Sequence, residues 1–276
     1  MLELIARLIP HLDVETIVPL HGGSTYETVE VNGAWIVQLG RTDYAAETLR
    51  HQVQVLPRLA PLLGVPVPKP ELVCEAPTAI IYRKLDGLPC DRAPDGAWPE
   101  QLGRFLHELH ATPPEFVGLA PEPADRCREQ ARADCARLRA VVAPDLRPAE
   151  LARADALFAS YLDDARNWRF PCALRHNDLG PKHVLVTPGG DLAAVIDWEE
   201  VGLGDPAWEF AWWLHAMPVT GERALAAYGE PDDARFLDRT GFVRALMSWL
   251  DVEHGVRTGN VARQQAGLAR VRAHLS

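Results

Sequence analysis

The sequence predicts an α+β fold of two lobes, with a β-rich lobe over residues 1–85 and a mainly helical lobe over residues 86–276. Alternating apolar residues and turn signals dominate the first third of the chain, which is typical of strands. Apolar residues at three- and four-residue steps dominate the remainder, which is typical of helices. With 276 residues, 47% of them hydrophobic, the chain is long enough to bury a sizeable core without disulfides.

The beginning of the chain predicts a helix followed by a β-hairpin. The segment LELIARLIPHL carries apolar residues at helical spacing, and residues 26–39 then alternate. The pair Asn32-Gly33 tolerates positive φ and favours a tight two-residue turn. The residues expected to face inward are Val29, Val31, Trp35 and Val37.

Residues 44–63 predict a helix, because leucines and valines recur there at three- and four-residue steps up to Gly64. The prolines of VPVPKPELV exclude a helix and favour an extended segment. The apolar segment AIIYRKL predicts a strand that ends at the turn signal Asp86-Gly87. The amino-terminal lobe is therefore expected to end near this turn.

The remaining sequence is mostly helical in its periodicity, with one exception. The segment ALRHNDLGPKHVLVTPGGDLAAVIDW contains two short apolar strands around a Gly-Gly turn. The expected helices span residues 98–111, 122–141, 148–163, 206–216, 232–256 and 260–275.

Charge and cysteine content narrow the class of protein. The net charge of -10 and the pI near 5.5 disfavour nucleic acid or an anionic membrane surface as partners, whereas a cationic ligand is compatible. The five cysteines are scattered without zinc-ligand spacing, which indicates a reducing compartment. The sequence shows neither a basic leader followed by an apolar stretch nor an apolar run of about 20 residues. We therefore expect a cytoplasmic protein.

Three polar residues stand at the loop ends of the two short carboxy-terminal strands. If VLV and AAVI pair through the TPGGD turn, then Asp178, His183 and Asp197 meet at one end of the hairpin. Phosphoryl transfer needs a carboxylate that receives the proton of the attacking hydroxyl, and ligands for a magnesium ion that bridges the phosphates. A single Asp after a strand is more often a turn or cap residue, but the three together favour a catalytic site.

The segment HNDLGPKHVLV, followed by VIDWEEVGLGDP, resembles the signature of the aminoglycoside phosphotransferase family, whose members are relatives of protein kinases. The segments GGSTYETVEV, VPVPKP, YRKLDG and FLHELHA are similar to further blocks of the family in the same order. The resemblance implies a two-lobed protein-kinase-like fold. It also implies an O-kinase that moves the γ-phosphate of ATP or GTP, with Mg²⁺, to a hydroxyl of a small molecule. The expected acceptor is a cationic, aminoglycoside-type antibiotic, and the expected role is antibiotic resistance.

The resemblance assigns a role to each motif residue. Asp178 matches the catalytic base, and Asp197 matches a metal-binding Asp. His183 stands where the family usually has a magnesium-binding Asn. Magnesium prefers oxygen to imidazole nitrogen, but a neutral imidazole can still bind a divalent metal or hold a metal-bound water, so His183 is expected to be a metal ligand. Asp205 matches a motif that braces the loop, and His176 is expected to hold the loop in shape through its ring hydrogen bonds.

Two substitutions depart from the kinase-like pattern. Gln38 falls where such folds place a phosphate-contacting Lys, and Gln52 falls on the position of its Glu partner. An uncharged amide pair is therefore expected in place of the ion pair. The alternatives are that Arg41 or Lys84 supplies the charge, or that Glu47 is the helix acid.

Further nucleotide contacts are expected at two places. The loop residues Gly22, Gly23 and Ser24 precede the first hairpin strand and suit phosphate binding through backbone N–H groups. The strand AIIYRKL resembles the hinge that binds a purine edge. Its contact residues are expected to be Tyr82, Arg83 and Leu85.

Two sets of residues are candidates for the acceptor side of the site. Acidic residues suit the ammonium groups of a polyamine sugar. These are Glu199, Glu200 and Glu209, together with Asp251 and Glu253. Tryptophans at helical spacing either form an apolar wall for a macrolide or, more commonly, belong to the core. They are Trp208, Trp212, Trp213 and Trp249.

The alternatives to an aminoglycoside kinase are a kinase for another small molecule or a silent binding protein. The alternative acceptors are a macrolide, a peptide antibiotic, a choline-like amine and a sugar. A catalytically silent kinase-like protein is expected only if Gln38 and Gln52 have abolished productive nucleotide binding.

Overall fold

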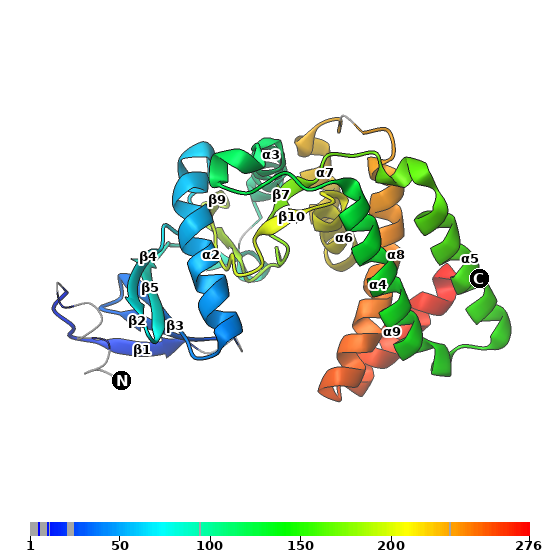
Figure 1. The fold of residues 1–276 in the computed structure, drawn as a ribbon, viewed down its shortest axis with the longest axis horizontal. Helices are drawn as coiled ribbons and strands as arrows, with labels where there is room; N and C mark the ends of the chain where they lie inside the picture. Colours follow the sequence, from blue (N-terminus) through cyan, green and yellow to red (C-terminus); the bar gives the residue numbers. More distant parts are fainter. Residues whose placement is uncertain (1–4, 6–9, 11, 21–24, 94, 232) are drawn as a thin grey trace. The chain divides into compact units, whose positions relative to one another are not determined.

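The computed structural model describes residues 5, 10, 12–20, 25–93, 95–231 and 233–276 (Figure 1). Contacts between residues divide the chain into two compact units. The first unit comprises Met1–Ala120 and His176–Gly202, and the second comprises Pro121–Arg175 and Leu203–Ser276. The expected boundary near residue 85 divides the chain by its type of secondary structure, whereas these units divide it by contacts between residues. The expected boundary therefore stays a prediction. The expected amino-terminal helix lies largely outside the described residues.

A five-stranded antiparallel sheet forms the core of the first unit, with strand order β1-β2-β3-β5-β4 (Figure 1). The hairpin of β2 and β3 was predicted, but its loop has three residues rather than two, because Val31 pairs with Trp35. Asn32 and Gly33 hold positive φ of 53° and 67°, as their residue types allow. The strands are β1 (Ile17–Leu20), β2 (Tyr26–Val31), β3 (Trp35–Gly40), β4 (Glu71–Glu75) and β5 (Thr78–Arg83).

The predicted inward residues of the hairpin do face a core. Val29, Val31 and Val37 are fully buried and Trp35 packs against them. The helix α2 (Asp43–Leu59) contacts β3 and β5 and continues into the 3-10 turn η1 (Ala60–Leu62). It begins where the Thr42 side chain accepts a hydrogen bond from the Ala45 N–H, which caps the first turn.

The first unit also holds a small three-stranded sheet of order β6-β8-β9. The strands β8 and β9 confirm the predicted pair around the Gly-Gly turn, and α3 matches its predicted range. Gln101 on α3 fixes the turn, because its side chain contacts the Asp191 carboxylate at 2.9 Å and the Leu192 N–H at 2.5 Å. The elements are β6 (Leu88–Pro89), η2 (Cys90–Arg92), α3 (Trp98–Ala111), η3 (Pro114–Val117), β8 (Val184–Val186) and β9 (Leu192–Val195).

The second unit is mainly helical, with the strands β7 and β10 paired beside the helices. Its apolar cluster includes Tyr161 stacked on Phe242, with ring centroids 3.6 Å apart. The periodicity predicted five of its six helices, but not α7. The elements are α4 (Ala124–Val142), η4 (Ala143–Asp145), α5 (Pro148–Asp163), η5 (Ala165–Trp168), β7 (Ala173–Arg175), β10 (Gly202–Gly204), α6 (Ala207–Ala216), α7 (Pro218–Tyr228), α8 (Phe236–Thr258) and α9 (Val261–His274).

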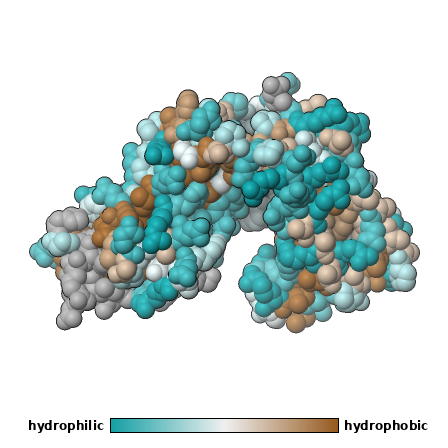
Figure 2. Space-filling model, in the orientation of Figure 1, coloured by the Kyte–Doolittle hydropathy of each residue, from teal (hydrophilic) through white to brown (hydrophobic). Residues whose placement is uncertain are grey.

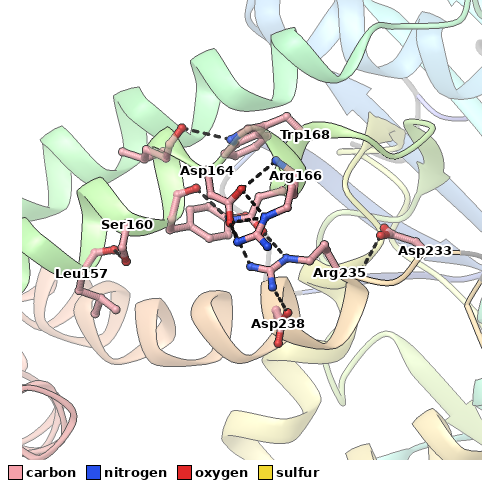
Figure 3. Close-up of polar contacts among 11 residues, drawn as sticks. Leu157, Ser160, Asp164, Arg166, Trp168, Asp233, Arg235 and Asp238 are labelled. Atoms are coloured by element: carbon pink, nitrogen blue, oxygen red, sulfur yellow. Dashed lines mark hydrogen bonds and ion pairs between the residues drawn. The ribbon is translucent and has the colours of Figure 1, made fainter.

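Polar contacts join α5 and η5 to the start of α8 within the second unit (Figure 3). The Arg235 guanidinium lies 3.4 Å from an Asp164 carboxylate oxygen and 2.5 Å from one of Asp238. Asp164 also pairs with Arg166 at 2.7 Å and accepts its backbone N–H. The segment before α8 is therefore held by charge as well as by apolar packing.

Hydrophilic residues cover most of the face drawn in Figure 2, and hydrophobic residues appear there in separate patches. Among the residues that the structure describes, no helix has an apolar stretch long enough to cross a membrane.

Candidate active site

The β8–β9 hairpin brings two separate segments of the first unit together. Val184 pairs with Val195, and the Ile196 N–H donates to the His183 carbonyl at 2.9 Å. The loop before β8 and the residues after β9 therefore meet at the same end of the hairpin, as the sequence predicted.

Asp178, His183 and Asp197 converge at this end. The His183 Nε2 atom lies 3.1 Å from an Asp197 carboxylate oxygen, and its Nδ1 atom lies 3.6 Å from an Asp178 carboxylate oxygen. Candidate ligand atoms from all three residues lie within 4.8 Å of one another. The His183 side chain is 19% exposed, whereas those of Asp178 and Asp197 are 58% and 39% exposed, so the carboxylates are open to a ligand.

The hydrogen bond of the His183 ring fixes which nitrogen is available to a ligand. Nδ1 lies 2.6 Å from the Asp178 carbonyl oxygen, which can only accept, so Nδ1 carries the hydrogen. In the neutral ring, Nε2 then presents a lone pair beside the Asp197 carboxylate. The Nε2 lone pair and the carboxylate oxygen repel each other at this distance unless a proton or a cation lies between them.

The donor set fits a divalent metal ion. Adjacent ligands of an octahedral Mg²⁺ lie about 3 Å apart, since each bond is roughly 2.1 Å long. The separation of 3.1 Å between His183 Nε2 and Asp197 matches this spacing. The backbone hydrogen bond from the other ring nitrogen is the arrangement usual for a metal-binding His.

The electrostatic field at the cluster is negative and suits a cation. Partial burial is the main reason that the pKa of Asp178 lies above its ordinary value; His183 counteracts the rise, and Asp197 and Glu200 add to it. Burial also raises the pKa of Glu199, with Asp197 as the second cause. These carboxylates repel one another, so a bound cation would relieve the repulsion.

One residue of the cluster, and one residue next to it in the chain, have left-handed backbone conformations although neither is glycine. Asp197 has a φ of 66° and Asn177 a φ of 70°. The Asn177 side chain donates to the Glu200 carbonyl at 2.7 Å, which ties the loop before β8 to the segment after Asp197. Such conformations are uncommon and cluster at functional sites.

His176 and Asp205 have extensive internal contacts. The His176 ring is fully buried, lies 2.8 Å from the Ile196 carbonyl through Nε2, and accepts the Asp178 N–H at 3.3 Å through Nδ1. In the second unit, Asp205 accepts two hydrogen bonds, of 2.8 and 3.0 Å, from the buried Arg239. Both arrangements suit the expected structural roles, which stay predictions.

The expected amide pair of Gln38 and Gln52 is not formed. The Gln52 side chain donates to the Tyr26 hydroxyl at 3.2 Å, and the buried Gln38 carbonyl oxygen has no partner among the described residues. The alternative cations are already paired with acids of β2, Arg41 with Glu27 and Lys84 with Glu30. Within the described part of the chain, no Lys or Arg donates a hydrogen bond to the Gln38 carbonyl oxygen.

The predicted hinge residues line a pocket of about 510 Å³ in the first unit. Tyr82, Arg83 and Leu85 share it with Trp35, whose ring lies under the Arg83 guanidinium at 3.8 Å. The loop residues Gly22, Gly23 and Ser24 lie outside the described residues. Their expected role in phosphate binding, like that of the hinge, stays a prediction.

The predicted acceptor acids differ in their accessibility. Glu199 and Glu200 line a pocket of about 560 Å³ beside α2, together with Glu47. Glu209 is only 5% exposed on α6 in the second unit, so it is the least accessible of the three predicted contacts. Asp251 is paired with His215, Arg263 and Arg270, and Glu253 is paired with Arg137, so the fold already uses both.

The tryptophans are mainly core residues. Trp213 and Trp249 are almost fully buried. Trp208 and Trp212 are partly buried against the apolar cluster of the second unit, to which Trp249 belongs. The core interpretation therefore accounts for all four residues.

Sequence reasoning missed two residues that contact the segment after Asp197. The Tyr44 hydroxyl donates to a Glu200 carboxylate oxygen at 2.9 Å, and His51 Nε2 lies 2.9 Å from the Val201 carbonyl. Both residues belong to α2, and no motif marks them. Only the pairing of distant segments reveals their contact with the site.

Solved structures identify the class of fold. The GDP and kanamycin complex of APH(2″)-IIia matches with a TM-score of 0.80 and 20% identity, over 99% of this chain and 98% of that chain. A macrolide 2′-phosphotransferase from Brachybacterium faecium matches with a TM-score of 0.71 and 24% identity, over 98% and 97% of the chains. The chain therefore has the two-lobed, kinase-like α+β fold of these enzymes, as predicted.

The family follows from the sequence comparison. The model of the phosphotransferase enzyme family matches residues 16–239, which is most of the chain. A viomycin phosphotransferase from Streptomyces vinaceus is 28% identical, over 96% of this chain and 90% of its own length. The chain belongs to the phosphotransferase enzyme family, and its activity class is that of a phosphotransferase.

Proposed function

We propose that this phosphotransferase moves the γ-phosphate of ATP or GTP to a hydroxyl of a small-molecule antibiotic, with an aminoglycoside-type compound as the first candidate. The convergence of Asp178, His183 and Asp197 carries the proposal. The relatives support it, because solved neighbours are complexes with GDP, kanamycin, gentamicin and streptomycin. The proposed role is antibiotic resistance.

Asp178 orients the acceptor hydroxyl and receives its proton as the oxygen attacks the γ-phosphorus. The bond from the γ-phosphorus to the bridging oxygen breaks, and the nucleoside diphosphate leaves. The raised pKa of Asp178 makes its carboxylate a better proton acceptor than an ordinary Asp. Its 58% exposure leaves room for the acceptor.

His183 and Asp197 would hold a divalent ion through Nε2 and a carboxylate oxygen. When bound, such an ion neutralises phosphate charge and aligns the phosphate for transfer. His183 keeps Nε2 directed toward Asp197 because its Nδ1 is held by the Asp178 carbonyl. Magnesium is the proposed ion, although an imidazole ligand also suits manganese.

The acceptor class rests on charge. Glu199 and Glu200 lie two and three residues after Asp197 and line a pocket on the first unit, where an ammonium group would find two carboxylates. A compound like viomycin is the second candidate acceptor, favoured by the relative that matches nearly the whole chain.

The test is incubation with magnesium and either triphosphate across a panel of aminoglycosides, viomycin and macrolides. The expected result is one added phosphate on an aminoglycoside, detected by mass spectrometry and absent with Asp178→Asn. A phosphate added only to viomycin or a macrolide would reassign the acceptor. The matched control is Asp163→Asn, an exposed Asp of the second unit.

A thermal-shift titration separates the enzyme from a silent binding protein. A nucleotide that binds only the folded state must raise the melting temperature. The proposal expects a rise with ATP or GTP that increases with magnesium. The absence of a shift with either nucleotide would contradict it and favour a silent protein.

A further inference from the structure

We propose that Cys127 and Cys172 form a covalent-modification site for peroxide, at which oxidation joins the two thiols in a reversible disulfide. Neither residue belongs to the proposed phosphoryl-transfer site, so this inference goes beyond the proposed function. Both cysteines lie in the second unit.

The fold brings the two sulfur atoms together from distant parts of the chain. Cys127 lies in the first turns of α4, and Cys172 directly precedes β7. Their Sγ atoms lie 3.1 Å apart, close enough for a thiol–thiol hydrogen bond. Both cysteines are free, and a disulfide with a bond of about 2.05 Å needs the sulfurs to approach by about 1 Å.

The surroundings hold this pair in place. Cys172 is part of the apolar cluster of the second unit, and Cys127 packs against that cluster. On the next residue, Arg128 donates through Nε to the Leu162 carbonyl at 2.9 Å, which fixes the start of α4. The contact between the sulfurs therefore rests on packed elements.

The two thiols have different reactivity. Cys127 is partly exposed. The hydrogen bond that it shares with Cys172 is the main cause that lowers its pKa, and Arg175 also lowers it, against the effect of burial. Cys172 is buried, and its pKa is raised, first by the same hydrogen bond and then by burial. Peroxide reaches the partly exposed Cys127 more easily than the buried Cys172, so Cys127 reacts first as its thiolate and Cys172 resolves the product.

The chemistry balances with hydrogen peroxide as the oxidant. The Cys127 thiolate attacks one peroxide oxygen, the O–O bond breaks, and the departing hydroxide takes a proton to become water. This leaves a sulfenic acid on Cys127. The Cys172 sulfur then loses its proton and attacks the Cys127 sulfur, the S–O bond breaks, and a second water leaves. Two thiols lose two electrons in total, and one peroxide becomes two waters.

The other cysteines provide internal controls. Cys90 and Cys135 are buried, and burial raises the pKa of each to about 12. Cys74 is partly exposed in the first unit, and no sulfur neighbour is found for it among the described residues. Oxidation is therefore expected to be selective for one pair out of five cysteines.

The disulfide would place a covalent link close to the catalytic loop along the chain. Cys172 is joined to His176 by β7 alone, and Asp178 follows two residues later. A crosslink between α4 and this segment restricts the chain that enters the loop. A disulfide at this site can therefore change the position of β7.

The test uses the full-length protein, reduced first and then treated with increasing hydrogen peroxide. Free thiols are counted with a chromogenic reagent, and the peptides are mapped by mass spectrometry without reduction. The expected result is a fall from five free thiols to three, a peptide crosslink between Cys127 and Cys172, and full reversal by dithiothreitol. Cys74→Ser is expected to keep the crosslink and serves as the matched control.

Two variants make the outcome decisive. Cys172→Ser is expected to stop at a sulfenic acid on Cys127 that dimedone traps. Cys127→Ser is the second variant, because a hydroxyl at the buried position 172 could disturb folding, whereas Cys127 is the more exposed partner. This variant is expected to leave Cys172 reduced. Irreversible oxidation of Cys127 in the wild type, pairing with another cysteine, or five thiols that persist would each overturn the proposal.

Discussion

Asp197 combines a charge with a backbone conformation that few residues accept. Its φ of 66° lies in the left-handed region, which Asn and Asp tolerate better than other non-glycine residues. Asn can therefore replace Asp197 without disturbing the turn after β9. The substitution Asp197→Asn therefore removes the charge of this residue and keeps its backbone conformation.

We expect Asp197→Asn to abolish most turnover while leaving the fold intact. A metal ion typically stabilises a transition state by several kcal/mol, so its loss lowers kcat at least about 100-fold. The melting temperature without ligand is expected to stay within about 2 °C, because surface changes usually alter stability by less than about 0.5 kcal/mol. Steady-state kinetics and thermal unfolding measure both quantities. A near-normal kcat in this variant would show that Asp197 does not bind the metal ion.

His183 offers a second prediction at this scale, concerning the choice of metal. Replacing imidazole by a carboxamide oxygen favours magnesium over manganese, because hard cations prefer oxygen. We expect His183→Asn to keep magnesium-dependent activity and to lower the ratio of kcat/KM with manganese to kcat/KM with magnesium. His183→Ala is the control and is expected to lose activity with both ions. An unchanged ratio in the Asn variant would contradict ligation by Nε2.

Among the elements, α2 has an unusual connection to the site. Gln38 and Gln52 do not bond to each other, because Gln52 donates to Tyr26 instead. Tyr44 and His51 on α2 contact residues 200 and 201. These contacts lie three and four residues after Asp197. Two hydrogen bonds, rather than a buried charge pair, therefore connect α2 to the proposed metal-binding turn.

We expect the double variant Tyr44→Phe, His51→Leu to lower kcat roughly 10-fold, because each hydrogen bond contributes about 0.5–1.5 kcal/mol. Thermal unfolding checks that the fold persists. Gln54→Ala is the matched control, since Gln54 also lies on α2 but bonds to Gly118. If the control and the double variant lose activity equally, the hydrogen bonds of Tyr44 and His51 have no specific role in turnover.

The sequence predicts elements well where one face is clearly apolar. The ranges of α3 and α5 were predicted to the residue, whereas α7 was missed because its buried residues are the small Gly221 and Ala224. Strand β1 was also missed, since it is a mostly exposed edge strand with a proline. Small or exposed residues leave no periodic apolar signal to detect.

The candidate site was predictable where a motif carried it. Asp178, His183 and Asp197 come from one contiguous segment whose two strands pair, so local sequence was enough. The prediction of an amide pair between Gln38 and Gln52 was wrong, because Gln52 bonds to the Tyr26 hydroxyl instead. Strand register alone cannot reveal that partner. The contact between Cys127 and Cys172 joins segments too far apart for any spacing rule.

For the molecule as a whole, the ionised Asp251 should govern part of its stability in acid. Asp251 is 9% exposed and connects α8 to α6 and α9 through His215, Arg263 and Arg270. Burial alone would raise its pKa, but these hydrogen bonds outweigh burial and lower the pKa from 3.8 to about 2. The carboxylate therefore favours the folded state whenever it is ionised.

The difference between the two pKa values corresponds to about 2 kcal/mol of folding free energy. Because the folded-state pKa is the lower one, this contribution is complete above about pH 4 and is lost as the pH falls toward about 2. We expect Asp251→Asn to lower the free energy of unfolding in urea at pH 6, with a difference from wild type that narrows below pH 4. Asp155→Asn, at an exposed pair with Arg139, is the control. A difference that stays constant from pH 6 to pH 2.5 would contradict the assignment.

The discontinuous first unit has a consequence for synthesis on the ribosome. Its residues 176–202 carry the proposed catalytic cluster, yet they follow a 55-residue segment, residues 121–175, that belongs to the second unit. The five-stranded sheet is fully translated long before the β8–β9 hairpin emerges. Nascent chains shorter than about 200 residues must therefore lack the cluster however well their strands have folded, and a fragment that stops at residue 120 would be inactive.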